Sequence, residues 1–187
     1  EHHQLLEECD ILVLQLEIPL ETVVYAAQEA YRLGKQVILD PAPVPKEFPE
    51  ELYQYLDIIK PNETELGMLT GIKEPESHLK EAVECLREKG VHNIIVTLGE
   101  KGVYVDCKTM KAEWIPAIKV HAVDTTAAGD SFTAALAIML AEGKSLREAV
   151  IFANYVSSIV VTRKGAQTSI PTLEEVRCYI KLKETAL

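Results

Sequence analysis

The chain has 187 residues, enough for one domain with a sizeable core, and its 48% apolar and 26% charged residues exclude an extended, disordered polypeptide. No apolar run approaches the ~18–20 residues of a membrane-spanning helix. The net charge of −10 argues against sequence-independent binding to nucleic acid or to an anionic membrane, because both require a basic surface. We therefore expect neither a nucleic-acid nor a membrane partner.

The four cysteines lie far apart in the sequence, and no two of them form a CxxC pair. A zinc ribbon or a thioredoxin-type motif is therefore not expected, and scattered thiols are typical of a reduced, cytoplasmic protein. The chain begins with a helix-like segment that runs directly into an apolar strand, without an initiator methionine. We expect it to be the C-terminal portion of a longer protein, with a single α/β domain over residues 1–187.

Short apolar runs alternate with helix-like segments along the first half of the chain. Most of these segments repeat apolar residues three and four positions apart, and a glycine follows each of them, which is typical of helices with a left-handed cap. We expect strands at residues 11–14, 37–39, 57–60 and 94–96, and helices at residues 21–33, 62–70 and 79–86.

The pattern changes after residue 101. Residues 102–106 and 112–115 look like two strands joined by a tight turn, an antiparallel addition. A helix is expected at residues 128–142. A capping box at Ser145 predicts the start of a second helix, and a third is expected to begin at Thr172. Strands that alternate with helices predict an α/β fold with a doubly wound, mostly parallel, Rossmann-like sheet that carries helices on both faces.

Ligand sites in such folds lie beyond the carboxyl ends of the strands. In this chain those positions are Glu17, Asp40, Asn62, Gly99 and the loop before Ala128.

The loop at residues 124–132 (DTTAAGDSF) is the most informative of these positions. Its small residues let the backbone approach a ligand closely, and the following helix directs N–H groups and its positive end toward the loop. A phosphate is a natural occupant, and Asp130 in the first turn could accept a proton from an attacking hydroxyl. Small residues and Asp are also favoured at helix starts for structural reasons, so spacing alone leaves both interpretations open.

The segment NETE at residues 62–65 follows the third predicted strand. Asn62 and Glu65 could hold phosphate oxygens and a hydrated Mg²⁺, since Mg²⁺ prefers oxygen ligands and keeps its waters. The alternative is a purely structural helix start, with Asn62 as the N-cap and Glu65 three residues later, and taken alone the pattern favours it.

Three further stretches have a structural interpretation, and the first two also have a functional one. Residues 97–102 (TLGEKG) could cover a nucleotide, although a simple hairpin explains the spacing at least as well. Glu17 could bind sugar hydroxyls or could be a solvated loop residue. Residues 162–167 end a long predicted helix, and their structural interpretation is a basic last turn with a glycine cap.

Taken together, these stretches resemble the ribokinase family of carbohydrate kinases, which also contains fructokinases and adenosine kinase. Residues 124–132 are similar to the family's C-terminal anion-hole motif, and residues 60–65 (KPNETE) to its internal NxxE motif. Residues 15–17, 40–43 and 161–171 are similar to the ribokinase branch in particular. The resemblance spans essentially the whole chain in one order.

The resemblance implies ATP-dependent phosphorylation of D-ribose at its 5-hydroxyl, which gives ribose 5-phosphate. A related sugar or nucleoside kinase, such as a deoxyribokinase or a fructokinase, is an alternative within the family. An alternative of another class is a non-catalytic nucleotide-binding module that kept the fold. The joint presence of Asp130, Asn62 and Glu65 speaks against that module, because a dead site has no chemical need for the base.

The resemblance also assigns roles to individual residues. Asp130 would be the base for the ribose hydroxyl, Glu17 would bind ribose, and the backbone amides of Ala127, Ala128 and Gly129 would receive phosphoryl charge. ATP would lie beside Asn62, Thr97, Leu98, Gly99, Glu100, Lys101, Gly102, Gly129 and Asn154. Glu65 would organise Mg²⁺ through water, and an activating K⁺ would bind at Asp124, Thr126, Val160, Arg163, Gly165 and Ser169.

One departure from the family is large. The family's first Gly-Gly motif and its small β-sheet lid are not found in this chain. In the family that part supplies most ribose contacts and the usual dimer contact, so the resemblance implies that the intact protein is a homodimer formed through the lid.

Overall fold

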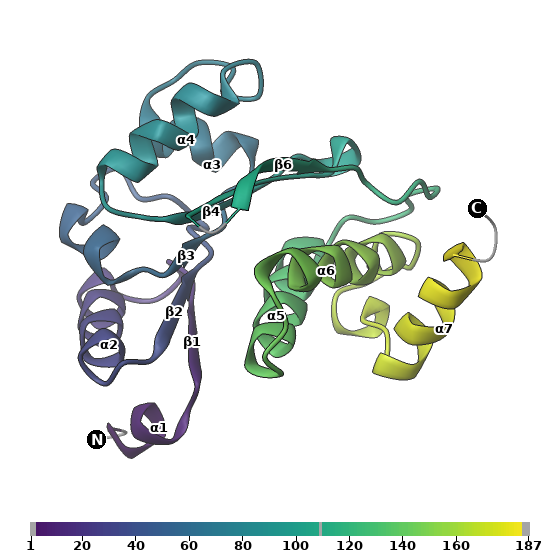
Figure 1. The fold of residues 1–187 in the computed structure, drawn as a ribbon, viewed down its shortest axis with the longest axis horizontal. Coiled ribbons are helices and arrows are strands. Elements are labelled where there is room, and N and C mark those ends of the chain that lie inside the picture. Colours follow the sequence, from purple (N-terminus) through teal and green to yellow (C-terminus); the bar gives the residue numbers. More distant parts are fainter. Residues whose placement is uncertain (1–2, 109, 185–187) are drawn as a thin grey trace. The chain divides into compact units, whose positions relative to one another are not determined.

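A computed structural model describes residues 3–108 and 110–184 (Figure 1). By its internal contacts the chain divides into two compact units. The first comprises the residues up to Gly99 together with Val103–Ile115, and the second comprises Glu100–Gly102 together with Pro116 and the residues after it. In the described part of the chain, no helix has both the length and the apolar character that crossing a bilayer requires. The prediction of one domain over residues 1–187 stays a prediction.

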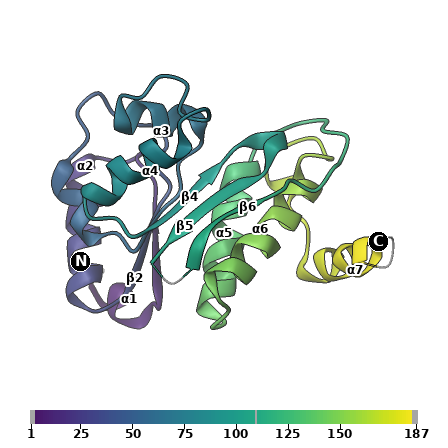
Figure 2. The same ribbon diagram turned by 45° about the horizontal axis from the view of Figure 1, so that its top comes forward.

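The first unit is built on a mixed sheet of six strands that lie side by side in chain order. The first four strands pair in parallel, and the last two are antiparallel and form a hairpin that extends the sheet (Figure 2). The predicted α/β class and its antiparallel addition are therefore confirmed. The strands are β1 (Ile11–Leu14), β2 (Gln36–Leu39), β3 (Ile58–Ile59), β4 (Asn93–Thr97), β5 (Val103–Cys107) and β6 (Met110–Ile115).

The helices of the first unit share one core with the parallel strands. Val37 and Leu39 of β2 and Ile94 and Val96 of β4 point into this core, because alternate residues of a strand face the same side. Ile38, between two of them, points to the opposite side of the sheet and is also fully buried. Figure 1 shows the helices along the sheet; they are α1 (His3–Glu8), α2 (Leu20–Arg32), the 3-10 helix η1 (Glu50–Tyr55), α3 (Glu63–Thr70) and α4 (Leu79–Glu88).

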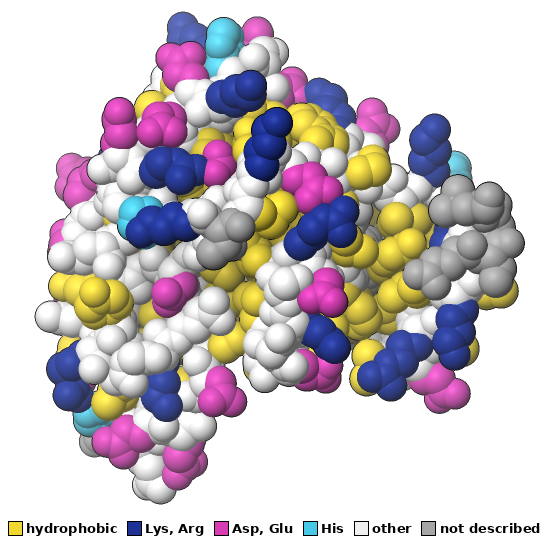
Figure 3. All heavy atoms as spheres, viewed as in Figure 1, with side chains coloured by type: hydrophobic (Ala, Val, Ile, Leu, Met, Phe, Trp, Pro, Cys, Tyr) yellow, Lys and Arg dark blue, Asp and Glu magenta, His cyan; other side chains and the backbone are white. Residues whose placement is uncertain are grey.

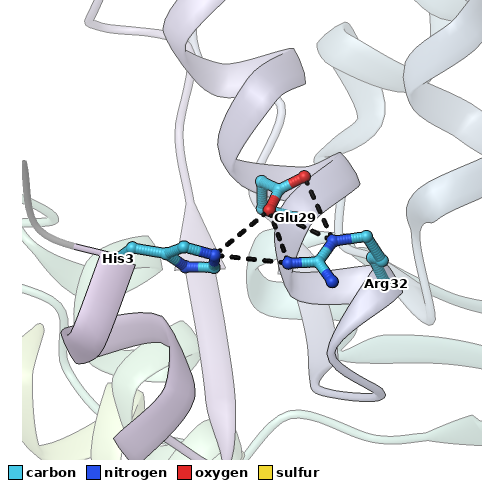
Figure 4. A network of polar contacts seen from close by, with 3 residues as sticks. All are labelled: His3, Glu29 and Arg32. Carbon is cyan, nitrogen blue, oxygen red and sulfur yellow. Dashed lines mark hydrogen bonds and ion pairs between the residues drawn. The ribbon is translucent and has the colours of Figure 1, made fainter.

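Polar contacts join the short helix α1 to α2. His3 Nε2 lies 3.5 Å from Glu29 Oε2, and Arg32 Nη2 donates to the same oxygen at 2.9 Å (Figure 4). The hydrogen bond from Arg32 lowers the pKa of the Glu29 carboxyl. Lys35 Nζ adds a hydrogen bond to the backbone carbonyl of Glu7 at 2.7 Å. These contacts hold α1 beside the amino end of the sheet, away from the strand ends where ligands are expected.

The second unit is helical. Helix α5 packs against α6, and α6 also contacts α7. The capping box predicted at Ser145 is present, because the Ser145 side chain accepts the Glu148 N–H while the Glu148 carboxylate accepts the Ser145 N–H. The elements are α5 (Ala128–Ala141), α6 (Leu146–Val160), the 3-10 helix η3 (Gln167–Ser169) and α7 (Leu173–Glu184).

Acidic and basic side chains are interspersed over the face drawn in Figure 3. With a net charge of −10, the chain does not attract an anion through its overall field. A phosphate ligand would need local donors, such as the backbone amides at the start of a helix.

Candidate active site

Polar residues follow the carboxyl ends of the parallel strands in the first unit. Asp40 comes directly after β2, and Lys60 comes directly after β3. Lys60 Nζ lies 3.0 Å from Asp40 Oδ2, and the two side chains are only 3% and 5% exposed. The sequence predicts Asp40 at a strand end, whereas Lys60 was not among the predicted site residues. The available signal was a lysine at the end of an apolar strand, directly before a proline.

Asn62 and Glu65 form a complete capping box at the start of α3. The Asn62 side chain accepts the Glu65 N–H at 2.9 Å, while the two Glu65 oxygens accept the Asn62 backbone N–H and side-chain amide, each at 2.8 Å. The structural interpretation of NETE is therefore confirmed. It leaves a ligand-binding role open, since a carboxylate oxygen can accept more than one contact.

The Glu65 carboxyl lies in a partly buried, charged environment. Burial raises its pKa, and the hydrogen bond from the Asn62 N–H offsets part of the rise. The nearby Asp40 carboxylate adds to the rise and the Lys60 ammonium opposes it. Asp40, Lys60 and Glu65 therefore act on one another and form one electrostatic group, which we call the strand-end cluster.

The end of β4 lies beside the strand-end cluster. Asn62 forms an isolated parallel bridge with Thr97, whose N–H donates to the Pro61 carbonyl at 3.0 Å. Thr97 also pairs with Val103 across the β4–β5 hairpin, so the predicted hairpin is confirmed. The connection contains the 3-10 turn η2 (Gly99–Lys101).

The residues of this hairpin connection differ in what they could offer a ligand. The Leu98 side chain belongs to the core, so that only its backbone could contact a nucleotide. Glu100 and Lys101 are exposed. Gly99 and Gly102 have φ of +53° and +102°, in the left-handed region that favours glycine. Binding of ATP by any of them stays a prediction.

Glu17 is exposed and follows β1 in a loop that is tied to its neighbour. The Leu16 N–H donates to the Ala42 carbonyl at 2.9 Å, which joins the loops after β1 and β2. The predicted contact of Glu17 with ribose is not tested by this arrangement.

Helix α5 of the second unit starts without a capping side chain. Its N-cap, Ala127, has φ of +61°, a conformation that costs an L-residue roughly 1–2 kcal/mol. The Ala128 N–H donates to the Thr125 carbonyl at 3.2 Å, and the Ser131 N–H makes the first helical bond, to the Ala127 carbonyl. The Gly129 amide lies between them in the first turn, where N–H groups have no acceptor within the helix.

Asp130 lies exposed in this first turn. A second contact holds the turn against α6, because Ser157 Oγ donates to the Ala128 carbonyl at 3.0 Å. The uncapped start of α5 leaves N–H groups such as that of Gly129 available to an anion, and the Asp130 carboxylate lies beside them. The predicted residues Ala127, Ala128, Gly129 and Asp130 are thus placed together, and their catalytic role stays a prediction.

Asp124 joins this loop to the loop after α6. Its Oδ1 accepts the Thr126 N–H and its Oδ2 accepts the Gly165 N–H, each at 3.0 Å. These hydrogen bonds lower the pKa of the Asp124 carboxyl to about 2, and the one from the Gly165 N–H has the largest effect. The backbone N–H groups of Val123 and Asp124 both point to the Val161 carbonyl, at 2.7 and 3.2 Å.

The structure brings part of the predicted K⁺ group together. Asp124, Thr126 and Gly165 are linked directly, and the ionised Asp124 carboxylate supplies the negative charge that suits a cation. Ser169 is fully buried and its Oγ donates to the Ala166 carbonyl at 2.6 Å. Val160 is the last residue of α6. The Arg163 guanidinium donates to the Glu175 carboxylate of α7 at 2.7 Å.

Asn154 lies on α6 and is 8% exposed. Its side-chain amide donates to the Pro116 carbonyl at 2.9 Å, which ties the segment after β6 to α6. This contact is structural, and the predicted contact of Asn154 with a nucleotide is not tested by it.

Among the residues described, no group of three or more His, Cys, Asp or Glu side chains could hold a metal ion. Mg²⁺ is commonly held by one or two carboxylates together with water and substrate phosphates. The half-buried Glu65 carboxylate, fixed by Asn62, fits that mode of binding through water.

Comparison with known proteins identifies the family. The family model of the pfkB family carbohydrate kinases matches residues 1–173, and the chain therefore belongs to this family. It is 43% identical over 175 residues to a ribokinase of Haemophilus influenzae, covering 93% of this chain and 56% of that protein. It is 38% identical over 180 residues to a deoxyribokinase of Salmonella typhi, covering 96% of this chain and 58% of that protein.

A solved structure supports the same assignment. The fold is similar, with a TM-score of 0.89 and 36% identity, to Arabidopsis thaliana ribokinase complexed with ribose and ATP, covering 94% of this chain and 57% of that one. The chain thus spans somewhat more than half the length of each of these three relatives.

Proposed function

We propose that the protein to which this chain belongs transfers the γ-phosphoryl group of ATP to the 5-hydroxyl of D-ribose, giving ribose 5-phosphate and ADP. Asp130, in the first turn of the uncapped helix α5, is the observation that carries the proposal. The 43% identity to a ribokinase and the similarity to a ribokinase complexed with ribose and ATP support it.

The mechanism follows from the start of α5. Asp130 removes the proton from the sugar hydroxyl, which is a poor nucleophile until that proton leaves. The amides of the first turn, with Gly129 at their centre, receive the negative charge of the transferring group. Attack is in line with the departing ADP, so that positioning and charge stabilisation account for the catalysis.

Two cations would take part in the proposed reaction. Glu65 would hold Mg²⁺ through water, and the ion, bound with the nucleotide, would supply positive charge to the phosphate oxygens. The loops that Asp124 joins would hold K⁺, and the ion would stabilise the backbone around the start of α5.

A second candidate substrate comes from the same family. A deoxyribokinase is 38% identical to the chain, so a deoxyribose kinase is the second candidate. The two sugars differ only in the 2-hydroxyl, and Glu17 is our candidate for a ribose contact. A non-catalytic nucleotide-binding module is the third candidate, and the presence of both Asp130 and Glu65 argues against it.

Location and assembly are also proposals. All four cysteines are free thiols in the structure, which suits a reduced cytoplasmic location. A homodimer formed through a lid outside this chain follows from the family resemblance, and light scattering on the full-length protein tests it.

A coupled assay of ADP release by the full-length protein, with ribose, 2-deoxyribose, fructose and adenosine as acceptors, tests the function. We expect the highest kcat/KM with ribose. A higher value with another sugar reassigns the substrate, and no turnover with any acceptor supports the non-catalytic module.

A further inference from the structure

The buried ion pair between Lys60 and Asp40 has no role in the chemistry proposed above. Both side chains are nearly inaccessible to solvent, and their charged atoms lie 3.0 Å apart. Stability alone is a weak explanation, because an apolar pair of similar volume is often at least as stable as a buried ion pair. The place of the pair in the sheet offers a better explanation.

Strand β3 is too short to fix the position of the residues that follow it. Ile58 and Ile59 pair with β2, and before them Asp57 exchanges hydrogen bonds with Val37. Beyond them, the Lys60 N–H donates to the Leu39 carbonyl at 2.9 Å. The next residue is Pro61, which has no N–H to donate. The backbone connection to β2 therefore ends directly before Asn62, the residue that starts α3.

Beyond the last backbone hydrogen bond between β3 and β2, the ion pair joins the residues that follow these two strands. The Lys60 side chain reaches from the exit of β3 to Asp40 at the exit of β2, and the Asp40 N–H is in turn bonded to the Leu14 carbonyl of β1 at 2.9 Å. On the other side, Thr97 at the end of β4 binds the Pro61 carbonyl. The segment before Asn62 is thus held from both neighbouring strands.

We propose that Lys60 and Asp40 are positioning residues whose buried pair fixes the exit of β3, and with it the Asn62–Glu65 capping box. This inference rests on the proposed function in so far as Asn62 and Glu65 bind the nucleotide with its Mg²⁺. The pair touches no ligand itself. It limits the movement of the turn that presents those two side chains.

Three hydrogen-bonded amides report directly on this turn. The Glu65 N–H is bonded to Asn62 Oδ1, the Leu66 N–H to the Asn62 carbonyl, and the Thr97 N–H to the Pro61 carbonyl. If the exit of β3 loosens, these amides exchange with solvent faster, while amides of α2 in the same unit do not. Their exchange can be measured without any nucleotide.

The decisive variant is the apolar double substitution D40L/K60M in the full chain. It removes the connection without leaving a buried charge unpaired, so we expect it to fold. We expect at least tenfold faster exchange at the three reporter amides and at least tenfold weaker binding of MgADP by calorimetry. The control E50Q/K89Q removes an exposed pair of the same unit, 2.7 Å apart, and should change neither quantity.

A second variant keeps the proposal testable if the apolar pair does not fold. D40N/K60Q removes both charges but keeps a polar connection, and we expect reporter exchange and MgADP affinity within threefold of the unmodified chain. A folded D40L/K60M with unchanged exchange and affinity overturns the proposal, as does a folded D40N/K60Q with fast exchange. If the unmodified chain fails to bind MgADP, the proposed function is in question, whereas the exchange rates still decide the positioning role.

Discussion

The Asp124 carboxylate accepts the backbone N–H of Gly165 at 3.0 Å and so connects two loops that are 41 positions apart in the sequence. Its other oxygen accepts the Thr126 N–H, one residue before the strained Ala127. One side chain therefore fixes both the entry to α5 and the loop after α6. This connection makes Asp124 a point where stability and the proposed cation site can be tested together.

We expect Asp124 to stabilise the fold in a pH-dependent manner. Its pKa is lowered from 3.8 to about 2 in the folded chain, so its contribution is complete above pH 3.8 and is lost as the pH falls toward 2. Unfolding by urea between pH 6 and pH 2 measures this. Asp124→Asn should lose less stability over the acidic range than the unmodified chain does. The control Glu174→Gln, at an exposed carboxylate of α7, should follow the unmodified chain, and identical acid profiles for all three would contradict the role of Asp124.

The full-length protein should be activated by K⁺. Asp124, Thr126 and Gly165 are joined in the structure, and a cation held by these loops would stabilise the backbone near Asp130. We expect higher kcat in K⁺ than in Na⁺ or Li⁺ at equal ionic strength, and a smaller difference in Asp124→Asn. Equal rates in all three salts would count against the site.

Nucleotide binding is expected of the chain itself. Binding to the folded state raises the melting temperature by mass action, and a concentration one hundred times the Kd contributes about 2.7 kcal/mol. We expect a thermal shift with MgADP that exceeds the shift with ADP alone, because in the proposed site Glu65 holds Mg²⁺ through water. Folded chain that gives neither heat nor a thermal shift with millimolar MgADP would refute the prediction.

Tyr53 offers a test of the core that is independent of function. Its ring is 1% exposed and stacks on Phe48 with ring centroids 4.6 Å apart, while its hydroxyl finds no hydrogen-bond partner among the described residues. A buried hydroxyl without a partner is costly, so Tyr53→Phe should raise the free energy of unfolding by about 1 kcal/mol. The matched control is Tyr31→Phe at a residue that is 59% exposed, which should change stability little. A destabilised Tyr53→Phe would indicate a partner for the hydroxyl.

Local patterns in the sequence predicted much of this fold. The apolar runs predicted β1, β2 and β4, and the Asn62–Glu65 spacing predicted the capping box, because each depends on residues a few positions apart. The strand expected at residues 57–60 is shorter, since only Ile58 and Ile59 pair with neighbours. The 3-10 helix η1 was not predicted, because its position depends on packing between α2 and the sheet rather than on a periodic pattern.

The candidate site was predicted less completely. The rule that ligands bind beyond the carboxyl ends of parallel strands predicted which residues lie there. It did not predict which other side chain or backbone group each of them contacts. Lys60 meets Asp40 across two strands, and Ser157 meets the Ala128 carbonyl across two helices. Such pairs are separated by 20 and 29 positions, and nothing in a single sequence marks which of many polar residues will meet.

Asp130→Asn in the full-length protein is the most direct test of the proposed chemistry. A positioned base typically contributes ~10²–10⁴-fold, and Asn keeps the shape of the side chain but cannot accept the proton, so kcat should fall by that factor. Affinity for ATP should change little, because the Gly129 amide remains.

A carboxylate that only favours the helix start would behave differently. Its loss should lower stability by about 1 kcal/mol and leave turnover nearly unchanged. Measuring kcat and the urea midpoint on the same Asp130→Asn protein separates the two roles. Asp106→Asn, at a carboxylate of β5 paired with Arg87, is a control for loss of a charge elsewhere, and it should alter the midpoint without a comparable fall in kcat. Near-normal turnover in Asp130→Asn with a lowered midpoint would refute the catalytic assignment.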